Sequence, residues 1–158
     1  MKREWLLLPL ICSLATATNS LACGDKLVQV VRGIRYQRAS AVRPANIVMF
    51  LSPNFDRHAA SRLRSDLAFV GHKVQIVEDA ASLVSILPTL PDIILTDVDN
   101  LPIVTEQVSS MSSKPTIIPI IDRSTQSAAA SLQVRFPFVM TSAARGLDQI
   151  AMITRALK

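Results

Sequence analysis

The chain has 158 residues, of which 49% are hydrophobic and 18% are charged, and its mean hydropathy is +0.34. This composition excludes intrinsic disorder, which requires few apolar residues and a high charge, and the length suits one compact domain. Two cysteines exclude a disulfide-dense scaffold, and two histidines leave few ligands for a metal cluster.

The first 22 residues have the parts of a secretory signal peptide. Lys2 and Arg3 precede an apolar stretch over residues 5–17, and residues 20–22 (Ser-Leu-Ala) supply a cleavage site of the small-x-small kind. The apolar stretch is shorter than the ~20 residues that span a bilayer. We therefore expect residues 1–22 to be removed and the protein to be exported to the periplasm or cell envelope. An uncleaved anchor or a buried helix is the alternative.

Cys23 would be the first residue of the mature chain, which is where bacterial lipoproteins carry their lipid. Ala22 is typical of the residue before a lipidated Cys, whereas Leu21 stands one place too close to it. Because Cys12 would be lost with the signal, Cys23 would be lipidated, free or paired with another molecule. A lipid at Cys23 would tether the protein to a membrane.

Basic residues are concentrated near the start of the mature chain. Residues 23–64 hold eight basic residues and only two acidic ones, Asp25 and Asp56. Residues 23–44 are expected to form a basic N-terminal arm or an added hairpin before the main domain. The charge over residues 26–64 would suit an anionic surface or an acidic partner, or it forms a solvated face. Nucleic acid is not expected as a partner, because Tyr36 is the one aromatic residue of the arm that could stack on a base.

Short apolar runs alternate with helical patterns from Ala45 to the end of the chain. The apolar runs predict five strands, at residues 46–51, 73–77, 92–96, 116–121 and 137–141. Spacing of three to four predicts helices after each strand, at residues 59–70, 80–87, 103–113, 124–132 and 147–157. Gly71 is expected to end the first helix and Asp79 to cap the second, whereas Pro119 fits a central strand poorly.

Five strand–helix units in succession predict an α/β fold, a doubly wound five-stranded parallel sheet with helices on both faces. In such sheets a ligand site lies at the carboxyl ends of the strands. The polar residues expected at that edge are Ser52, Asp79, Asp97, Asp99, Asp122 and Thr141.

Residues 91–102 (Pro-Asp-Ile-Ile-Leu-Thr-Asp-Val-Asp-Asn-Leu-Pro) resemble the third strand and following loop of receiver domains from two-component response regulators. Asp97 matches the phospho-accepting Asp of that family, and Pro102 falls one place later than the family's Pro. The resemblance covers residues 45–158 in the order and length of the elements. It implies a flavodoxin-like or receiver-like domain over residues 45–158, with strand order 2-1-3-4-5.

The other active-site residues of receivers have no match in this chain. Residues 51–53 (Leu-Ser-Pro) stand where receivers carry the acidic pair that holds Mg²⁺, and Asp122 follows the fourth strand, where Ser or Thr is usual. Residues 141–142 (Thr-Ser) replace the family's Lys. Because Mg²⁺ needs several hard oxygen ligands and a transferred phosphoryl group needs cationic stabilisation, we expect Asp97 not to be phosphorylated. We also expect no cofactor, no metal and no catalysis.

Two other kinds of site fit the sequence poorly. A loop that binds a flavin phosphate offers backbone N–H groups at a helix N-terminus, but Pro53 removes one such donor and no Gly is present there. His58 and His72 are expected at the surface rather than in a catalytic arrangement. Asp97 and Asp99 could act as an acid–base pair, although acids at strand ends commonly form caps and turns.

Two functions from different classes remain. The first is a non-catalytic, exported receiver-like module that contacts a protein partner or a second copy of itself. Receivers use their fourth and fifth helices for such contacts, and the similar segments here, residues 128–132 and 143–158, are rich in Ala and lightly charged. The second is a protein or enzyme that binds a small ligand or a cation in a pocket around Asp97.

Overall fold

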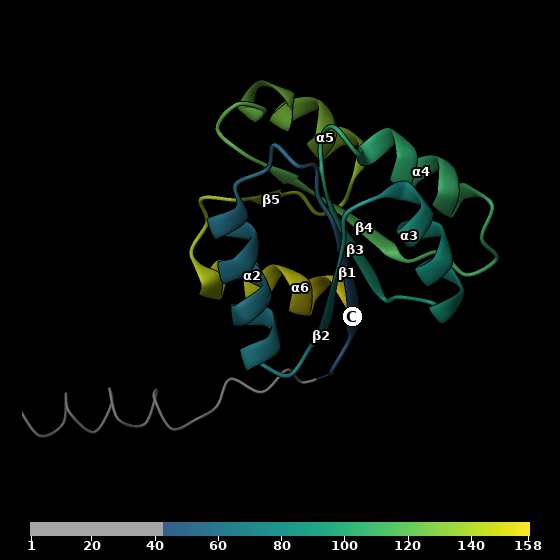
Figure 1. The fold of residues 1–158 in the computed structure, drawn as a ribbon. Helices are drawn as coiled ribbons and strands as arrows, with labels where there is room; N and C mark the ends of the chain where they lie inside the picture. Colours follow the sequence, from purple (N-terminus) through teal and green to yellow (C-terminus); the bar gives the residue numbers. More distant parts are fainter. Residues whose placement is uncertain (1–42) are drawn as a thin grey trace, which may run out of the picture. The chain divides into compact units, whose positions relative to one another are not determined.

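Five parallel strands form a single sheet in the computed structural model, which describes residues 43–158. The expected signal peptide, Cys23 and almost all of the basic arm lie outside the described residues. The strands are β1 (Asn46–Phe50), β2 (Lys73–Val77), β3 (Ile93–Asp97), β4 (Thr116–Ile121) and β5 (Met140–Thr141). Their order in the sheet is β2-β1-β3-β4-β5, and every pairing is parallel (Figure 1). The predicted doubly wound fold with order 2-1-3-4-5 is therefore confirmed.

Helices follow the strands, as the sequence predicts. They are α2 (Arg57–Phe69), α3 (Ala80–Ile86), α4 (Leu101–Ser109), α5 (Ala129–Arg135) and α6 (Gly146–Ala156), with the short 3₁₀ helices η1 (Leu87–Thr89) and η2 (Gln126–Ala128). In the part of the chain that is described, no helix is both long enough and apolar enough to cross a membrane.

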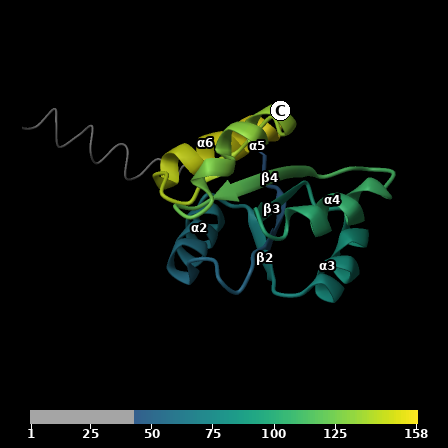
Figure 2. The ribbon, with the colours of Figure 1, turned by 90° about the horizontal axis from the view of Figure 1, so that it is seen from above.

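Alternating side chains divide the core into two layers, one on each face of the sheet. Ile47 and Met49 of β1 pack with the buried residues of α2 and α6, whereas Val48 and Phe50 pack with those of α3 and α4. This follows from the two-residue period of a strand, which sends successive side chains to opposite faces. Seen from above, α2 and α3 accordingly lie on opposite sides of β2 (Figure 2). A sheet covered on both faces reads as continuous apolar runs, which is why the sequence predicts it well.

Two aspartates and one glycine fix the ends of the first two helices. The Oδ1 atom of Asp56 accepts the N–H groups of His58 and Ala59 at the start of α2, and Asp79 accepts the Ser82 N–H at the start of α3. Beyond the end of α2, Gly71 has φ +102°, a conformation that L residues with a side chain rarely adopt. Asp79 and Gly71 thus have the roles that the sequence predicts for them.

The largest differences from the predicted elements are in β5, α4 and α5. Helix α5 begins five residues later than predicted, at Ala129, after the short helix η2, and ends three residues later, at Arg135. The apolar run at residues 137–141 forms only a two-residue strand, since Pro137 supplies no backbone donor. Helix α4 begins two residues earlier than predicted, with Pro102 in its first turn, and ends four residues earlier, at Ser109. Pro119, which fits a central strand poorly, does lie within β4. Strand β5 pairs with β4 only from Ile120 onward, so no strand lies beside Pro119 on the outer side of β4.

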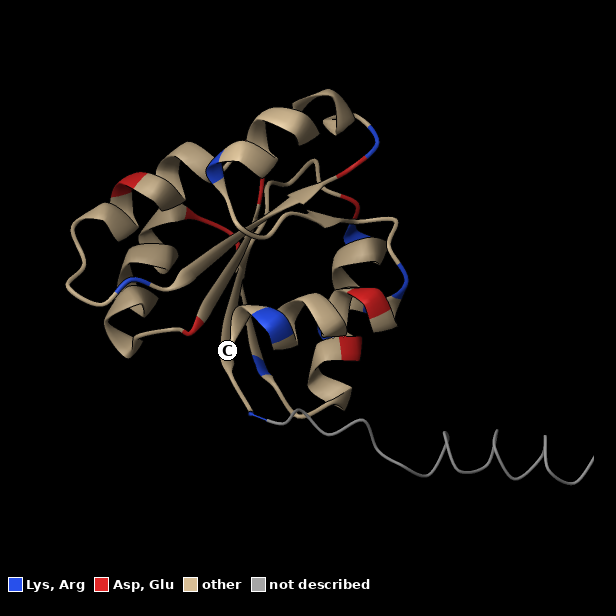
Figure 3. Cartoon of the chain, turned by 180° about the vertical axis from the view of Figure 1, so that it is seen from behind, with Lys and Arg blue, Asp and Glu red and all other residues tan. Residues whose placement is uncertain are grey.

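The described domain carries little net charge. Residues 43–158 hold eleven Lys and Arg against ten Asp and Glu, so the excess of basic residues lies mostly earlier in the chain. Arg57, Arg62 and Arg64 are exposed on α2 or at its start, and Arg43 pairs with Asp92 at 3.6 Å. Red segments in Figure 3 mark acidic positions where strands end, on the edge of the sheet at which the sequence predicts a site.

His72 is buried, and the prediction that it lies at the surface is wrong. Only 5% of the residue is exposed, and its Nδ1 atom accepts the backbone N–H of Ala45 at 3.2 Å. Because Nδ1 is the acceptor, the ring proton of the neutral form is on Nε2, which is buried and has no partner among the described residues. Burial lowers the pKa of His72 below its ordinary value of 6.5, and the charge of Asp92 partly opposes that shift. His58, by contrast, is exposed as predicted.

Candidate functional site

Asp97, the last residue of β3, connects two loops at the carboxyl edge of the sheet. Its residue exposure is 6%, and its two carboxylate oxygens accept different backbone N–H groups. Oδ2 accepts from Ser52, which follows β1, at 2.8 Å, and Oδ1 accepts from Asn100, which precedes α4, at 3.1 Å. Hydrogen bonds to a carboxylate are stronger than those between neutral groups. The Asp97 side chain therefore holds the loop after β1 against the turn that begins α4.

A small pocket of about 60 Å³ opens beside Asp97. It brings together four of the six residues that the sequence predicts at this edge, namely Ser52, Asp97, Asp99 and Asp122. One water molecule takes up about 30 Å³ of liquid, so the space admits a pair of waters or a small ion rather than an organic cofactor. The other lining residues are Asn54, Phe55, Val98, Ile120, Ser124 and Thr125.

Asp122 is occupied by hydrogen bonds within its own turn. Its Oδ1 atom accepts from the Ser124 hydroxyl at 2.7 Å and from the Thr125 hydroxyl and backbone N–H, each at 2.8 Å. The Thr125 hydroxyl oxygen also accepts the Asp122 N–H at 3.1 Å. These bonds, that from Ser124 foremost, hold the pKa of Asp122 below its ordinary value. In this turn, the side chains of Asp122 and Thr125 accept backbone N–H groups in place of carbonyl oxygens. The sequence Asp-x-Ser-Thr at residues 122–125 is typical of such a turn.

Asp79 and Thr141 lie at strand ends on the same edge of the sheet but do not line the pocket beside Asp97. Asp79 is exposed and caps α3, where the Ser82 N–H and hydroxyl are the first causes of its lowered pKa. Thr141 ends β5, and its backbone carbonyl accepts the Nε2 of the buried Gln149 at 3.3 Å. Both residues stabilise local structure at the edge of the sheet.

The acidic residues of the pocket do not form a metal-binding cluster. Within residues 43–158, no three His, Cys, Asp or Glu side chains are grouped so that they could hold a metal ion. The buried Nδ2 of Asn100, next to the Asp97 turn, has no partner among these residues. An amide N–H₂ group is a donor, so it offers nothing to a cation.

Several solved structures similar to this chain are described as response regulators or receiver domains. A protein from Chloroflexus aurantiacus described as a response regulator is 17% identical, with a TM-score of 0.60 over 73% of this chain and 98% of its own. The receiver domain of a histidine kinase from Syntrophus aciditrophicus is 18% identical, with a TM-score of 0.57 over 72% of this chain and 89% of its own. A CheY-like receiver domain from Methanospirillum hungatei is 16% identical, with a TM-score of 0.53 over 71% and 94% of the two chains.

These comparisons define the class of fold. The described residues have the receiver fold of response regulators, as the segment around Asp97 predicts. Identities this low establish the fold alone. No protein-family model matches the sequence, and no curated protein matches it.

The turn at Asp122 gives a direct test of its electrostatics. Ser124→Ala removes the first cause of the lowered pKa, so the pKa of Asp122 is expected to rise toward its ordinary value of 3.8. NMR titration of the side-chain carboxyl groups measures this change. Ser127→Ala, at an exposed position in η2, is the matched control and is expected to leave the pKa of Asp122 unchanged. An unchanged pKa in Ser124→Ala would contradict the hydrogen-bonded turn.

Proposed function

We propose that this protein is an exported, receiver-like protein-interaction module whose Asp97 is not phosphorylated. The observation that carries the proposal is the bonding of Asp97. Both of its carboxylate oxygens accept backbone N–H groups, from Ser52 and Asn100, and the residue is nearly buried. A carboxylate held in this way serves as a structural connection between loops, and the hydrogen bonds withdraw electron density from both oxygens and so make them weaker nucleophiles toward phosphorus.

The surrounding donor set does not fit the Mg²⁺ site of the family. Mg²⁺ requires near-octahedral oxygen ligands at about 2.0–2.1 Å. Ser52 and Pro53 stand where receivers carry an acidic pair, and the Ser52 N–H already occupies Asp97. The Oδ1 atom of Asp122 accepts three hydrogen bonds within its own turn. Among the lining residues of the pocket there is no Lys or Arg that could balance the charge of a phosphoryl group.

The surface formed by α5, β5 and α6 is the proposed site of protein contact. It carries two apolar side chains that are far more exposed than is usual for their type, Val134 on α5 at 88% and Leu147 on α6 at 76%. The segments around them are Ala-rich and carry few charges. Receivers use the same three elements for contacts between proteins, so a partner protein or a second copy would cover these side chains.

Val134→Asp and Leu147→Asp are each expected to weaken this contact, since a carboxylate in an apolar interface must be desolvated. Light scattering of the full chain is expected to give the mass of a dimer, or affinity capture from a cell-envelope extract to retain a partner, and both signals should fall in the two variants. Val84→Asp, at an exposed valine on α3, is the control and should behave as the parent chain. The proposed surface would be contradicted if the parent chain and the three variants were all monomeric and all captured the same proteins.

Export rests on residues 1–22, whose basic start, apolar stretch and small-x-small end support a cleaved signal. The mature protein would face the periplasm or envelope, tethered there if Cys23 is lipidated or held to an anionic surface through the basic residues of the 26–64 segment. Intact mass of protein recovered from an expressing bacterium is expected to show loss of residues 1–22, and any acyl chains on Cys23 would appear as added mass. Recovery of the uncleaved mass from the cytoplasmic fraction would contradict export.

The alternative is a weak cation or small-ligand site around Asp97. Its support is that Asp97, Asp99 and Asp122 line one pocket. Calorimetric titration with Mg²⁺ distinguishes the two functions: saturable binding that Asp99→Asn abolishes would favour the alternative. Absence of heat in both proteins is the result that our proposal predicts.

A further inference from the structure

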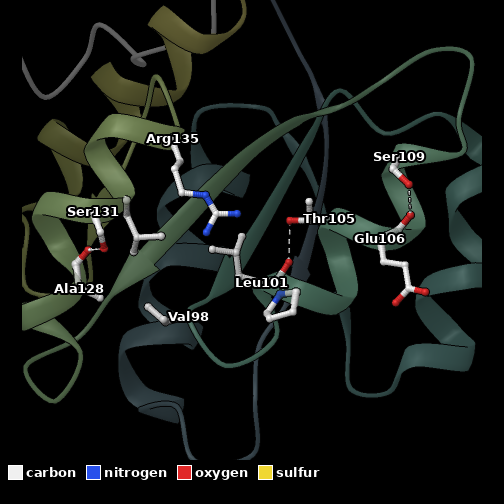
Figure 4. Close-up of a pocket in the computed structure, with 10 residues that line it drawn as sticks. Val98, Leu101, Thr105, Glu106, Ser109, Ala128, Ser131 and Arg135 are labelled. Carbon is white, nitrogen blue, oxygen red and sulfur yellow. Dashed lines mark hydrogen bonds between the residues drawn. The ribbon is translucent and has the colours of Figure 1, made fainter.

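A second and much larger cavity lies between α4 and α5, away from the pocket beside Asp97. It has a volume of about 630 Å³, within the range of about 300–1,000 Å³ that is typical of small-molecule sites. Figure 4 shows its walls, with α4 on one side, α5 on the other and Val98 near one end. Helix α4 supplies residues from Leu101 to Ser109, so the cavity is a groove about two turns of helix long.

The groove has an apolar end and a polar end. Val98, Leu101, Pro102, Ala128 and Leu132 give the end near the carboxyl edge of the sheet an apolar lining. The opposite end has Glu106 and Ser109 of α4, and the side chain of Arg135, from the last turn of α5, reaches back toward Leu101. A ligand that fills the groove would therefore be an amphiphile, with an apolar body and one polar group.

The hydroxyl groups on the walls do not donate into the groove. Thr105 donates to the Leu101 carbonyl at 2.8 Å, Ser109 to the Glu106 carbonyl at 2.6 Å and Ser131 to the Ala128 carbonyl at 2.8 Å. Figure 4 draws these three bonds, each within its own helical segment. Because the hydroxyl protons are used there, the donors left for a ligand are those of Arg135.

Arg135 extends from α5 toward Leu101 and Thr105 across the groove (Figure 4). It is the one cation among the lining residues, and no carboxylate within residues 43–158 forms an ion pair with it. Its guanidinium carbon lies 5.7 Å from the centroid of the Phe136 ring. Contact with the ring uses the face of the guanidinium and leaves the N–H groups in its plane available. The Glu106 carboxylate points away from Arg135 in Figure 4 and so does not neutralise it.

We propose that the groove between α4 and α5 binds a monoanionic amphiphile, with its apolar body against Val98, Leu101 and Leu132 and its carboxylate or sulfonate on Arg135. A single guanidinium matches one monoanion, which it binds through two parallel N–H bonds. A second copy of the chain fits less well, because two-fold symmetry about the groove sets groove against groove and leaves the space unfilled. This site goes beyond the proposed protein contact, with which it shares helix α5 but neither Val134 nor Leu147.

The probe for the test is 1-anilinonaphthalene-8-sulfonate, an aromatic monoanion that fluoresces when it enters an apolar site. The full chain is expected to bind it saturably, with dodecanoate as a competitor and dodecanol a much weaker one. Arg135→Gln is expected to weaken binding of both anions about ten- to a hundred-fold, since it removes a charge-assisted pair. Ser131→Trp is expected to have a comparable effect by filling the groove.

Arg123→Gln is the matched control, because Arg123 is an exposed arginine on the loop after β4 and does not line the groove. It should bind the probe as the parent chain does, and circular dichroism should show that all variants remain folded. Absence of saturable binding, or equal binding by the parent, Arg135→Gln and Ser131→Trp, would overturn the site. Loss of binding in Ser131→Trp alone, or equal competition by dodecanoate and dodecanol, would overturn the anionic class of ligand.

Discussion

Replacing Asp97 with Ala is expected to lower the free energy of unfolding by about 2–4 kcal/mol. The substitution leaves the N–H groups of Ser52 and Asn100 without their acceptor, and each unsatisfied buried donor costs about 1–3 kcal/mol. Ser52 and Asn100 are both only partly buried, so water can replace some of what the two N–H groups lose. Urea unfolding followed by circular dichroism measures the change.

Two further substitutions separate this structural role from a general effect of charge. Asp97→Asn keeps one carbonyl oxygen as an acceptor and should lose less stability than Asp97→Ala. Asp99→Asn removes an adjacent, exposed carboxylate for which the structure shows no hydrogen bond, and it should change stability by less than about 0.5 kcal/mol. Equal stability of Asp97→Ala and Asp99→Asn would show that the Asp97 carboxylate does not hold the two loops together.

His72→Leu is expected to destabilise the domain by about 1–3 kcal/mol at pH 8. The Ala45 N–H loses its acceptor in a buried position at the start of the sheet. In the parent protein, the stability that depends on neutral His72 should be complete above the unfolded-state pKa, about 6.5, and should decline as the pH falls below it. Stability falls with pH because the pKa of His72 is lower in the folded state than in the unfolded chain. As the solution is acidified, the unfolded chain therefore binds more protons than the folded protein does.

The pH dependence is the sharper part of that prediction. Unfolding free energies measured between pH 8 and pH 5 should fall more steeply for the parent than for His72→Leu. His58→Leu, at an exposed position on α2, should retain the steep dependence of the parent. Parallel curves for the parent and His72→Leu would contradict the assignment of His72 as a buried, neutral acceptor.

The regular part of the fold could be predicted because its information is local. Strands β2 and β4 have the predicted bounds, since β4 is marked by an Ile-rich run and the edge strand β2 by three β-branched residues shortly after the Gly71 that ends α2. Asp79 and Gly71 were predictable for a similar reason, because capping and positive φ depend on residues within one helical turn. The short β5 was not predicted, because an apolar run does not show that only Met140 and Thr141 pair with β4.

The site was predictable as a location but not as a set of interactions. The topology of a parallel sheet brings Asp97, Asp99 and Asp122 to one edge, and the structure places them around one pocket. The Asp97 hydrogen bond to Ser52 joins residues 45 positions apart, and the His72 bond to Ala45 joins residues 27 apart. Pairings at this range are set by the packed fold, so no local pattern signalled the structural role of Asp97 or the burial of His72.

The groove at Arg135 illustrates the same limit. Leu101 and Leu132 read as ordinary helical core positions, and Arg135 as an ordinary charge near a helix C-terminus. Only the placement of α4 beside α5 on one face of the sheet makes them the lining of a common cavity.

Intact-mass spectrometry after incubation with acetyl phosphate and Mg²⁺ tests the absence of phosphoryl transfer most directly. Acetyl phosphate supplies a phosphoryl group without a kinase, so the result depends on the chemistry of this chain alone. Since no three acidic, His or Cys side chains within residues 43–158 are grouped to hold a metal ion and no Lys or Arg lines the pocket beside Asp97, the mass of the full chain is expected to remain unchanged. A gain of one phosphoryl group that is lost in Asp97→Asn and retained in Asp99→Asn would show a working phospho-acceptor and contradict the proposed function.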